Sequence, residues 1–392
     1  MTAPAPTPNH PGFFQYFPGE YRWSAAIEGL LGAAAAGGAE LGEVDRVAGR
    51  LRSHLGDDDR WFEEWAAMAD HVRGLARKAE RAGHPLTAAG AYLRACLYAQ
   101  YGERFRTPKD RRALAVYRRS VESFHRFAEL SDGPPIECVE IPFERGSLPA
   151  YLVHAHTKGR RRPPVVVFFD GLDVTKEIQY AIAAPELARR GMSVLLVDGP
   201  GNGEAIRFRR QVLRHDTESY GSAALDSLEG RRDVDASRAA VMAISLGGYY
   251  APRIASMEPR YRACVAWGAI WDYHATWKRR IEAAFCTDLS VPGHHIEWVL
   301  GAKSLHDALR RLEPFRLDGV VQRMRCPFLL LHGEDDRQVP LADARALYRA
   351  CGSRDKTLRI FTRAEGGAQH CQRDNRALGV STIADWLQEK LA

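Results

Sequence analysis

Three apolar runs in the second half of the chain constrain its fold more than any other feature. VVVFF (165–169), VLLVD (194–198) and FLLLH (328–332) are apolar at consecutive positions, not at alternate ones. Strands with this pattern have both faces buried, which happens in a sheet that helices cover on each side. Because helix-sized segments separate the runs, the sequence predicts a parallel α/β sheet.

Eight short runs after Pro135 fit strands of such a sheet. They cover residues 136–143, 150–155, 164–169, 193–198, 238–244, 263–267, 327–332 and 357–361. The sixth and seventh runs are separated by residues 268–325, a connection far longer than the usual few residues. Connections of this length usually carry helices of their own or a functional role. Since this one is rich in aromatic residues, we expect a small helical lid there.

The first third of the chain has a different periodicity. Between about residues 20 and 130, apolar residues recur every three or four positions, which is the spacing of one helix face. A second such series runs through residues 88–98, and Pro108 opens a third helix. The first series consists of Trp61, Trp65, Met68, Val72 and Leu75. Paired helices of this size also fit a tetratricopeptide-like repeat.

Composition and pattern together give the domain organisation. Of 392 residues, 45% are hydrophobic and 27% are charged, which excludes disorder and a disulfide-stapled miniprotein. We expect a flexible tail (1–18), a helical N-terminal cap domain (19–133) and an α/β domain (134–392). No run reaches the roughly 18–20 apolar residues that cross a bilayer. The opening MTAPAPTPNHPG lacks the basic and apolar parts of a signal peptide.

Charge and cysteine usage narrow the partners and the compartment. The net charge of +6 comes from 55 basic and 49 acidic residues that are interleaved along the chain. We therefore expect no nucleic-acid partner. Seven cysteines are scattered without a CxxC pair, which fits neither a disulfide framework nor a zinc site. The sequence thus predicts a cytoplasmic protein with no bound metal.

Ser245 has the sequence context of a nucleophile. It directly follows the predicted strand 238–244 and precedes a helix that begins near Tyr249, so it lies on a tight strand–turn–helix bend. In such a bend, small residues two positions before and after the serine let strand and helix pass closely. Here they are Ala243 and Gly247, and the alanine departs from the usual glycine. The alternative is a serine that only caps the helix.

An acid and a histidine follow Ser245 in the order of a catalytic triad. Asp336 lies just beyond the carboxyl end of the seventh strand, where open α/β sheets place their sites. It is preferred over Asp335 because the pattern HGxxDxxVP sets the acid at this position. His370 lies in a glycine-rich loop after the eighth strand. The order Ser, Asp, His is that of α/β-hydrolase triads, in which the acid orients the imidazole and the imidazole takes the serine proton.

Acyl transfer also needs two hydrogen-bond donors for the oxyanion. One is expected from the backbone N–H of Leu246, directly after the nucleophile. The other is expected from the loop after the third strand, at the N–H of Leu172. The string DGPGNG (198–203) follows a strand but lacks the GxGxxG spacing of a dinucleotide loop, so we interpret it as a tight turn. No cofactor is expected.

Four strings in the chain resemble a known group of α/β-hydrolases. They are GLDVTKE (171–177), DGPGNGE (198–204), SLGGYY (245–250) and GGAQHC (366–371), and the likeness extends through the helical N-terminal segment. The group contains 2,6-dihydroxypseudooxynicotine hydrolase, fungal naphthopyrone chain-shortening hydrolases and the fermentation-respiration switch esterase. The resemblance implies an α/β-hydrolase fold with a mostly parallel eight-stranded sheet and an all-helical N-terminal domain that covers the active site.

The same resemblance implies a serine hydrolase that acts through an acyl-serine on a medium-sized aromatic or polyketide-like molecule. Better known members cleave a C–C bond beside a ketone, and an ester is the other expected substrate. Glu177 matches the group's glutamate and is expected to assist; the alternative is a carboxylate that is favoured by the dipole of a helix N-terminus. Tyr249, Trp271 and Trp277 are expected to exclude water and stack on the substrate.

Two other functions and one assembly state remain open from the sequence. An acyl-serine that passes its acyl group to an internal nucleophile would make a cyclase or acyltransferase. The other alternative is a binding protein with a hydrolase fold and no catalytic activity, although all three triad residues are present. A homodimer is expected because the helical region has more apolar positions than packing on one sheet edge would hide. These positions are Leu30, Leu31, Leu41, Val44, Val47, Leu51 and Leu55.

Overall fold

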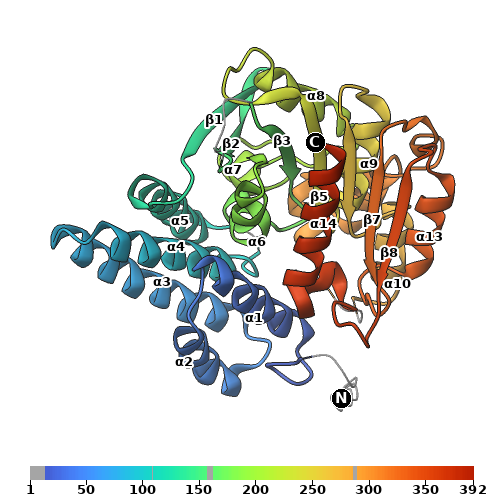
Figure 1. The fold of residues 1–392 in the computed structure, drawn as a ribbon. Coiled ribbons are helices and arrows are strands. Elements are labelled where there is room, and N and C mark those ends of the chain that lie inside the picture. Colours follow the sequence, from blue (N-terminus) through green and yellow to red (C-terminus); the bar gives the residue numbers. More distant parts are fainter. Residues whose placement is uncertain (1–13, 108, 157–161, 286–288) are drawn as a thin grey trace. The chain divides into compact units, whose positions relative to one another are not determined.

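The computed structural model describes residues 14–107, 109–156, 162–285 and 289–392 (Figure 1). These residues form two compact units. One consists of residues 14–132 and 289–293, and the other of residues 133–285 and 294–392. No helix among the described residues is both long and apolar enough to cross a membrane.

The first unit contains five α-helices among its described residues. They are α1 (Tyr21–Ala33), α2 (Leu41–Leu51), α3 (Asp58–Arg81), α4 (Pro85–Glu103) and α5 (Arg111–Leu130). Polar caps begin two of them: the Asp57 carboxylate accepts the N–H groups of Asp59 and Arg60, and Asp110 accepts that of Ala113. Pro108, predicted to open the third of the expected helices, lies outside the described residues, and that helix begins at Arg111.

Aromatic residues form the core of this unit. The Trp61 ring lies with its centroid 5.0 Å from that of Trp23, 5.6 Å from that of Trp65 and 5.1 Å from that of Phe105. The prediction that Leu75 shares this buried face is wrong, since Leu75 is 46% exposed. Ala76 is buried instead, because four residues bring a 3.6-residue helix closer to the starting face than three do.

The apolar residues on which the dimer expectation depends are mostly accounted for within the chain. Leu30, Val44, Val47 and Leu51 are fully buried, so they do not need a second copy to cover them. Leu41 and Leu55 are exposed by 66% and 50%. The premise that this region has many uncovered apolar positions is therefore wrong for Leu30, Val44, Val47 and Leu51.

The second unit is built on one eight-stranded sheet with strand order β1-β2-β4-β3-β5-β6-β7-β8. Pairs β1–β2 and β2–β4 are antiparallel and the others are parallel, which confirms the predicted mostly parallel sheet. The strands are β1 (Ile136–Phe143), β2 (Gly146–Val153), β3 (Pro164–Phe169), β4 (Ser193–Val197), β5 (Asp235–Ile244), β6 (Ala263–Trp267), β7 (Phe328–Gly333) and β8 (Lys356–Phe361).

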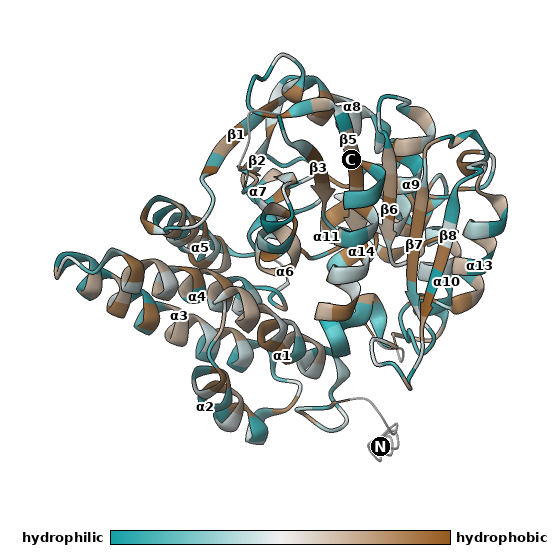
Figure 2. Cartoon of the chain, in the orientation of Figure 1, coloured by the Kyte–Doolittle hydropathy of each residue, from teal (hydrophilic) through white to brown (hydrophobic). Residues whose placement is uncertain are grey.

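The central strands are buried along nearly their whole length, and β3 and β7 are drawn in hydrophobic brown in Figure 2. The second strand is longer than predicted: it begins at Gly146, not at residue 150. A two-residue turn with Glu144 at φ 52° pairs Phe143 directly with Gly146. The start of this strand is polar, so no apolar run in the sequence indicates it. The register of the hairpin with β1 defines it instead.

Helices cover both faces of the sheet. Helices α6 (Lys176–Arg189) and α14 (Arg376–Lys390) pack together on one face, while α8 (Glu218–Leu228) and α9 (Gly247–Met257) pack together on the other (Figure 1). A short helix, α7 (Gly203–Arg207), follows β4, and α13 (Leu341–Ala350) follows β7.

The long connection between β6 and β7 has helices of its own, as predicted. Its described residues contain α10 (Tyr273–Glu282), α11 (His295–Leu300), α12 (Leu305–Leu312) and a short 3-10 helix, η3 (Val321–Arg323). That this segment acts as a lid stays a prediction.

Candidate active site

Ser245 lies on a strained turn between β5 and α9. Its φ is 61°, in the left-handed region that non-glycine residues rarely adopt. The turn is held on both sides, since the Ser245 N–H donates to Trp267 O at 2.8 Å and its carbonyl accepts from Gly248 N at 2.8 Å. A strained residue that the surrounding structure fixes so firmly is typical of a functional position.

The close passage of strand and helix depends on Gly247. A Cβ at this position would lie 2.4 Å from Ala243 Cβ and 2.6 Å from Asp170 O. At Gly248 a Cβ would lie 2.4 Å from Gly268 O. The alanine at position 243, which departs from the usual glycine, therefore fits because the facing residue is a glycine.

His370 and Asp336 reach Ser245 through two hydrogen bonds. Ser245 Oγ is 2.8 Å from His370 Nε2, and His370 Nδ1 is 2.7 Å from Asp336 Oδ2. The other carboxylate oxygen of Asp336 accepts the N–H groups of Gln338 and Val339, each at 2.9 Å. Since an ionised carboxylate only accepts hydrogen bonds, this arrangement puts a proton on Nδ1 of His370 and leaves Nε2 to face the serine.

The glycine-rich loop that carries His370 is fixed by a carboxylate. Asp374 accepts the N–H groups of Gly367, Ala368 and Gln369 at 2.9, 3.0 and 3.1 Å. Ala368 O in turn accepts the Asp335 N–H at 3.0 Å. This glycine-rich loop is therefore bonded to the end of β7, next to the acid.

Burial and charge act in opposite directions on the pKa values of this pair. Burial lowers the pKa of the His370 imidazolium, but the nearby Asp336 carboxylate outweighs it and raises the pKa to about 9. Burial likewise opposes ionisation of Asp336, while the charge and hydrogen bond of His370 hold its pKa well below the ordinary value. Asp336 and His370 thus stabilise each other in their charged forms.

The loop after β3 lies against the serine turn. A Cβ on Gly171 would be 2.7 Å from Ile244 O and 3.1 Å from Ser245 Cβ. In the described part of the chain, the N–H groups of Leu172 and Leu246 have no hydrogen-bond acceptor. That these two N–H groups stabilise an oxyanion stays a prediction.

Asn202 is a residue of this site that the sequence reasoning missed. Its side-chain amide donates to Gly171 O at 3.1 Å and to Val174 O at 2.7 Å, so it fixes both ends of the loop that contains Leu172. The string DGPGNG is the tight turn that we predicted, with Gly203 at φ 49°. Asn202 could have been found from the expected parallel sheet. If β3 and β4 are parallel neighbours, the loops that follow them lie together at the same edge.

Glu177 belongs to a buried polar network. It lies in the first turn of α6, fully buried, and its Oε1 accepts from the Tyr151 hydroxyl at 2.8 Å and lies 2.8 Å from Lys176 Nζ. Lys176 also pairs with Asp198 at 2.8 Å and with Glu204 at 2.7 Å. Burial lowers the pKa of the Lys176 ammonium, but these carboxylates raise it well above its usual value. The described contacts of Glu177 thus run to Tyr151 and Lys176.

The predicted substrate-binding aromatics occupy different environments. Tyr249 is fully buried on α9, and its hydroxyl donates to His215 O at 2.8 Å. Trp277 is fully buried on α10, where it contacts Tyr273 and Arg280. Trp271 is half-buried just before α10. None of the contacts described for these three residues is with Ser245 or His370.

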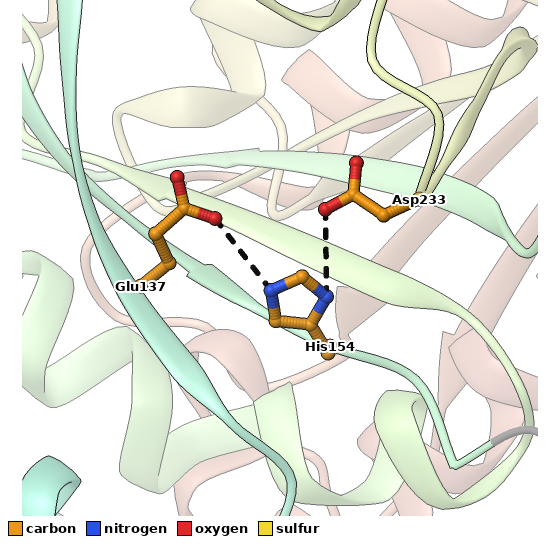
Figure 3. Close-up of side chains that lie close together, drawn as sticks. All are labelled: Glu137, His154 and Asp233. Atoms are coloured by element: carbon orange, nitrogen blue, oxygen red, sulfur yellow. Dashed lines mark ion pairs between the residues drawn. The ribbon is translucent and has the colours of Figure 1, made fainter.

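A separate cluster combines groups that often bind metals (Figure 3). His154 lies between Glu137 and Asp233, with N···O distances of 3.7 and 3.8 Å. The guanidinium of Arg231 already pairs with both carboxylates, at 2.6 Å each. Because a guanidinium there competes with a cation, we interpret the cluster as a surface ion-pair network.

The sheet order, the strand–turn–helix bend at Ser245 and the position of His370 beyond the last strand define an α/β-hydrolase. Residues 179–392 match the model of the prolyl oligopeptidase family. The chain therefore belongs to the prolyl oligopeptidase family.

Three similar proteins align with nearly the whole chain. Hydrolase LUC6 of Fusarium sp. is 32% identical, over 92% of this chain and 94% of its own. The 20-hydroxy-prefusarin hydrolase FUS2 of Gibberella moniliformis is 29% identical, over 93% and 95%. The crystal structure of 2,6-dihydroxy-pseudo-oxynicotine hydrolase matches with a TM-score of 0.77 at 25% identity, covering 92% of this chain and 96% of that one. The chain is accordingly a hydrolase of the α/β type.

Proposed function

We propose that this chain is a serine hydrolase that acts through an acyl-serine intermediate. The observation that carries the proposal is the continuous hydrogen-bond chain from Ser245 through His370 to Asp336. In this reading Ser245 is the nucleophile, His370 the general base and Asp336 the residue that orients the imidazole. Since this geometry is common to acyl-transfer enzymes of unrelated folds, it supports a reaction class more strongly than a substrate.

The proposed reaction begins with attack of Ser245 Oγ on a carbonyl carbon while His370 Nε2 takes the hydroxyl proton. The oxygen of the resulting tetrahedral intermediate would be stabilised by the N–H groups of Leu172 and Leu246. On collapse, the bond to the leaving group breaks and His370 returns the proton to that group. Water, activated by the same imidazole, then cleaves the acyl-serine.

For the substrate, we propose a medium-sized aromatic or polyketide-like ketone whose C–C bond beside the carbonyl is cleaved. The names of two similar proteins, a prefusarin hydrolase and a pseudo-oxynicotine hydrolase, support natural-product chemistry of this kind. Such cleavage expels a carbanion equivalent, which needs a proton donor or a fragment that can ketonise. Glu177 is the proposed assistant, acting directly or through Tyr151, to which it is hydrogen-bonded.

The first experiment is the serine variant. Ser245→Ala should lower kcat by several orders of magnitude and abolish labelling by a fluorophosphonate, which needs an activated serine. Ser256→Ala is a matched control, because Ser256 lies on α9, the helix that follows Ser245, and its hydroxyl donates to Pro252 O. Undiminished turnover in Ser245→Ala, or wild-type protein that forms no adduct on Ser245, would exclude this function.

An acyltransferase or cyclase differs only in what accepts the acyl group. Oxygen-18 water separates the two, because hydrolysis incorporates the label into the acid product and cyclisation does not. We propose hydrolysis, so the label should appear in the acid. A ligand-binding protein without catalysis would give neither product.

We also propose a cytoplasmic homodimer. Four cysteines in the described part of the chain are free thiols, which suits a reducing compartment: Cys264, Cys326, Cys351 and Cys371. Exposed apolar residues of the helical region that a contact between copies would cover include Leu41, Leu55, Leu75 and Leu86. A clean monomer in sedimentation at micromolar concentration would reject the dimer.

A further inference from the structure

Trp267, the last residue of β6, connects the two loops that carry Ser245 and His370. Its carbonyl oxygen accepts the Ser245 N–H at 2.8 Å and also the thiol of Cys371 at 3.3 Å. Its indole N–H donates to Gln372 Oε1 at 2.7 Å. One buried residue therefore holds the backbone of the nucleophile and the two residues that directly follow the histidine.

These two residues have unusual backbone conformations. Cys371 has φ 52° and ψ 37°, and Gln372 has φ 48° and ψ 38°, so both are left-handed although neither is a glycine. This conformation is unfavourable for any residue with a side chain, because its Cβ then lies too close to the carbonyl oxygen. Consecutive strained residues persist only where contacts hold them, and the two bonds to Trp267 are such contacts.

The packing around Trp267 leaves little room for movement. Trp267, Cys371 and Gln372 are all buried. A Cβ on the next residue, Gly268, would lie 3.3 Å from Cys371 Sγ and 3.5 Å from Ser245 Cα. A Cβ on Gly379 of α14 would lie 3.1 Å from the Trp267 ring. The histidine loop is thereby confined against the end of β6, beside the serine turn.

We propose that Trp267, Cys371 and Gln372 form a clamp that positions the His370 imidazole against Ser245. The clamp rests on the proposed function, because its purpose is to align the general base with the nucleophile. Cys371 and Gln372 are positioning residues: their polar atoms bond to Trp267, and they act through His370. The small displacement that loss of one bond allows should affect the chemical step, since proton transfer depends on near-contact geometry.

Paired substitutions test the clamp. Cys371→Ala removes the thiol donor, and Cys371→Ser keeps a donor at the same position. For hydrolysis of p-nitrophenyl acetate, Cys371→Ala should lower kcat about tenfold, as expected for one lost hydrogen bond, with KM within about twofold. Cys371→Ser should recover kcat to within about threefold of the wild type. The rate of fluorophosphonate labelling of Ser245 should follow kcat in both variants.

Gln372→Leu is an independent second variant, since it removes the acceptor of the indole N–H and should also lower kcat about tenfold at unchanged KM. Cys264→Ala is the matched control: Cys264 is a fully buried thiol on the same strand β6. It should leave kcat unchanged while showing what loss of a buried thiol does to thermal stability.

The inference is overturned if Cys371→Ala or Gln372→Leu keeps wild-type kcat, or if Cys371→Ser loses as much as Cys371→Ala. A loss that appears equally in Cys264→Ala would likewise reduce the clamp to general packing. These outcomes differ from failure of the proposed function, in which the wild type itself is not labelled on Ser245.

Discussion

Replacing the Asp336 carboxylate by an amide should shift the pH range in which Ser245 reacts. Burial lowers the pKa of His370, and the Asp336 charge overcomes this to raise it to about 9. In Asp336→Asn the charge is lost and the burial stays, so the pKa should fall below the ordinary 6.5. A pKa of about 9 instead of 6.5 corresponds to about 3 kcal/mol of net stabilisation of the imidazolium, to which Asp336 makes the largest contribution and Cys371 a further one.

Two kinetic changes follow. As the proposed general base, His370 takes a proton only when it is neutral, so kcat/KM of the wild type should rise with pH toward a pKa near 9. In Asp336→Asn the profile should already be level at neutral pH. The height of the plateau should fall by about 10⁴, because an amide no longer fixes the tautomer of the imidazole.

The assay is the rate of fluorophosphonate labelling of Ser245 as a function of pH. Asp335→Asn is the matched control, because this neighbouring carboxylate pairs with Arg363 instead of with His370. It should keep both the pKa and the plateau. An unshifted pKa in Asp336→Asn, or a larger effect in Asp335→Asn, would refute the reasoning.

The same pair gives a stability prediction with a defined sign. The folded-state pKa of His370 is raised, so its contribution is complete below about pH 6.5 and is lost as pH rises through about 9. The folded-state pKa of Asp336 is lowered, so its contribution is lost as pH falls below about 3.8. The difference in unfolding free energy between wild type and Asp336→Asn, measured in urea, should therefore be largest between about pH 3.8 and about pH 6.5. A difference that grows above pH 9 would contradict this.

Three further predictions concern other parts of the chain. Gly203→Ala should destabilise the protein by at least about 2 kcal/mol, because its Cβ would lie 1.9 Å from Asp198 Cγ. In the control Gly42→Ala on α2, the Cβ meets nothing within 4 Å, so the change should be neutral or slightly stabilising. Thermal unfolding of the two variants compares them. Glu177→Gln should lower turnover of the proposed ketone substrate far more than that of p-nitrophenyl acetate, and equal losses would contradict the proposal of C–C bond cleavage. In sedimentation velocity the full chain should run as a dimer.

Local sequence was sufficient to locate the eight strands, although not the start of β2, and to single out the three residues that lie in one hydrogen-bond chain. Runs that are apolar at consecutive positions identify strands with both faces buried, and the carboxyl ends of parallel strands lie at a common edge of the sheet. A serine, an acid and a histidine that each lie beyond the carboxyl end of a parallel strand are therefore brought to the same edge by the topology. The separations along the chain, from Ser245 to Asp336 and on to His370, do not matter for this inference.

The sequence could not reveal which side chains meet between the loops. The partnership of Glu177 with Tyr151, that of Asn202 with the loop after β3, and the convergence on Trp267 all join residues from different elements of the fold. Such contacts depend on the strand order and on the angle at which each loop leaves the sheet, and neither leaves a periodic trace in the sequence. Periodicity reports whether one face of an element is buried, but only the tertiary structure decides which partner covers it, because pairing energies act through space and not along the chain.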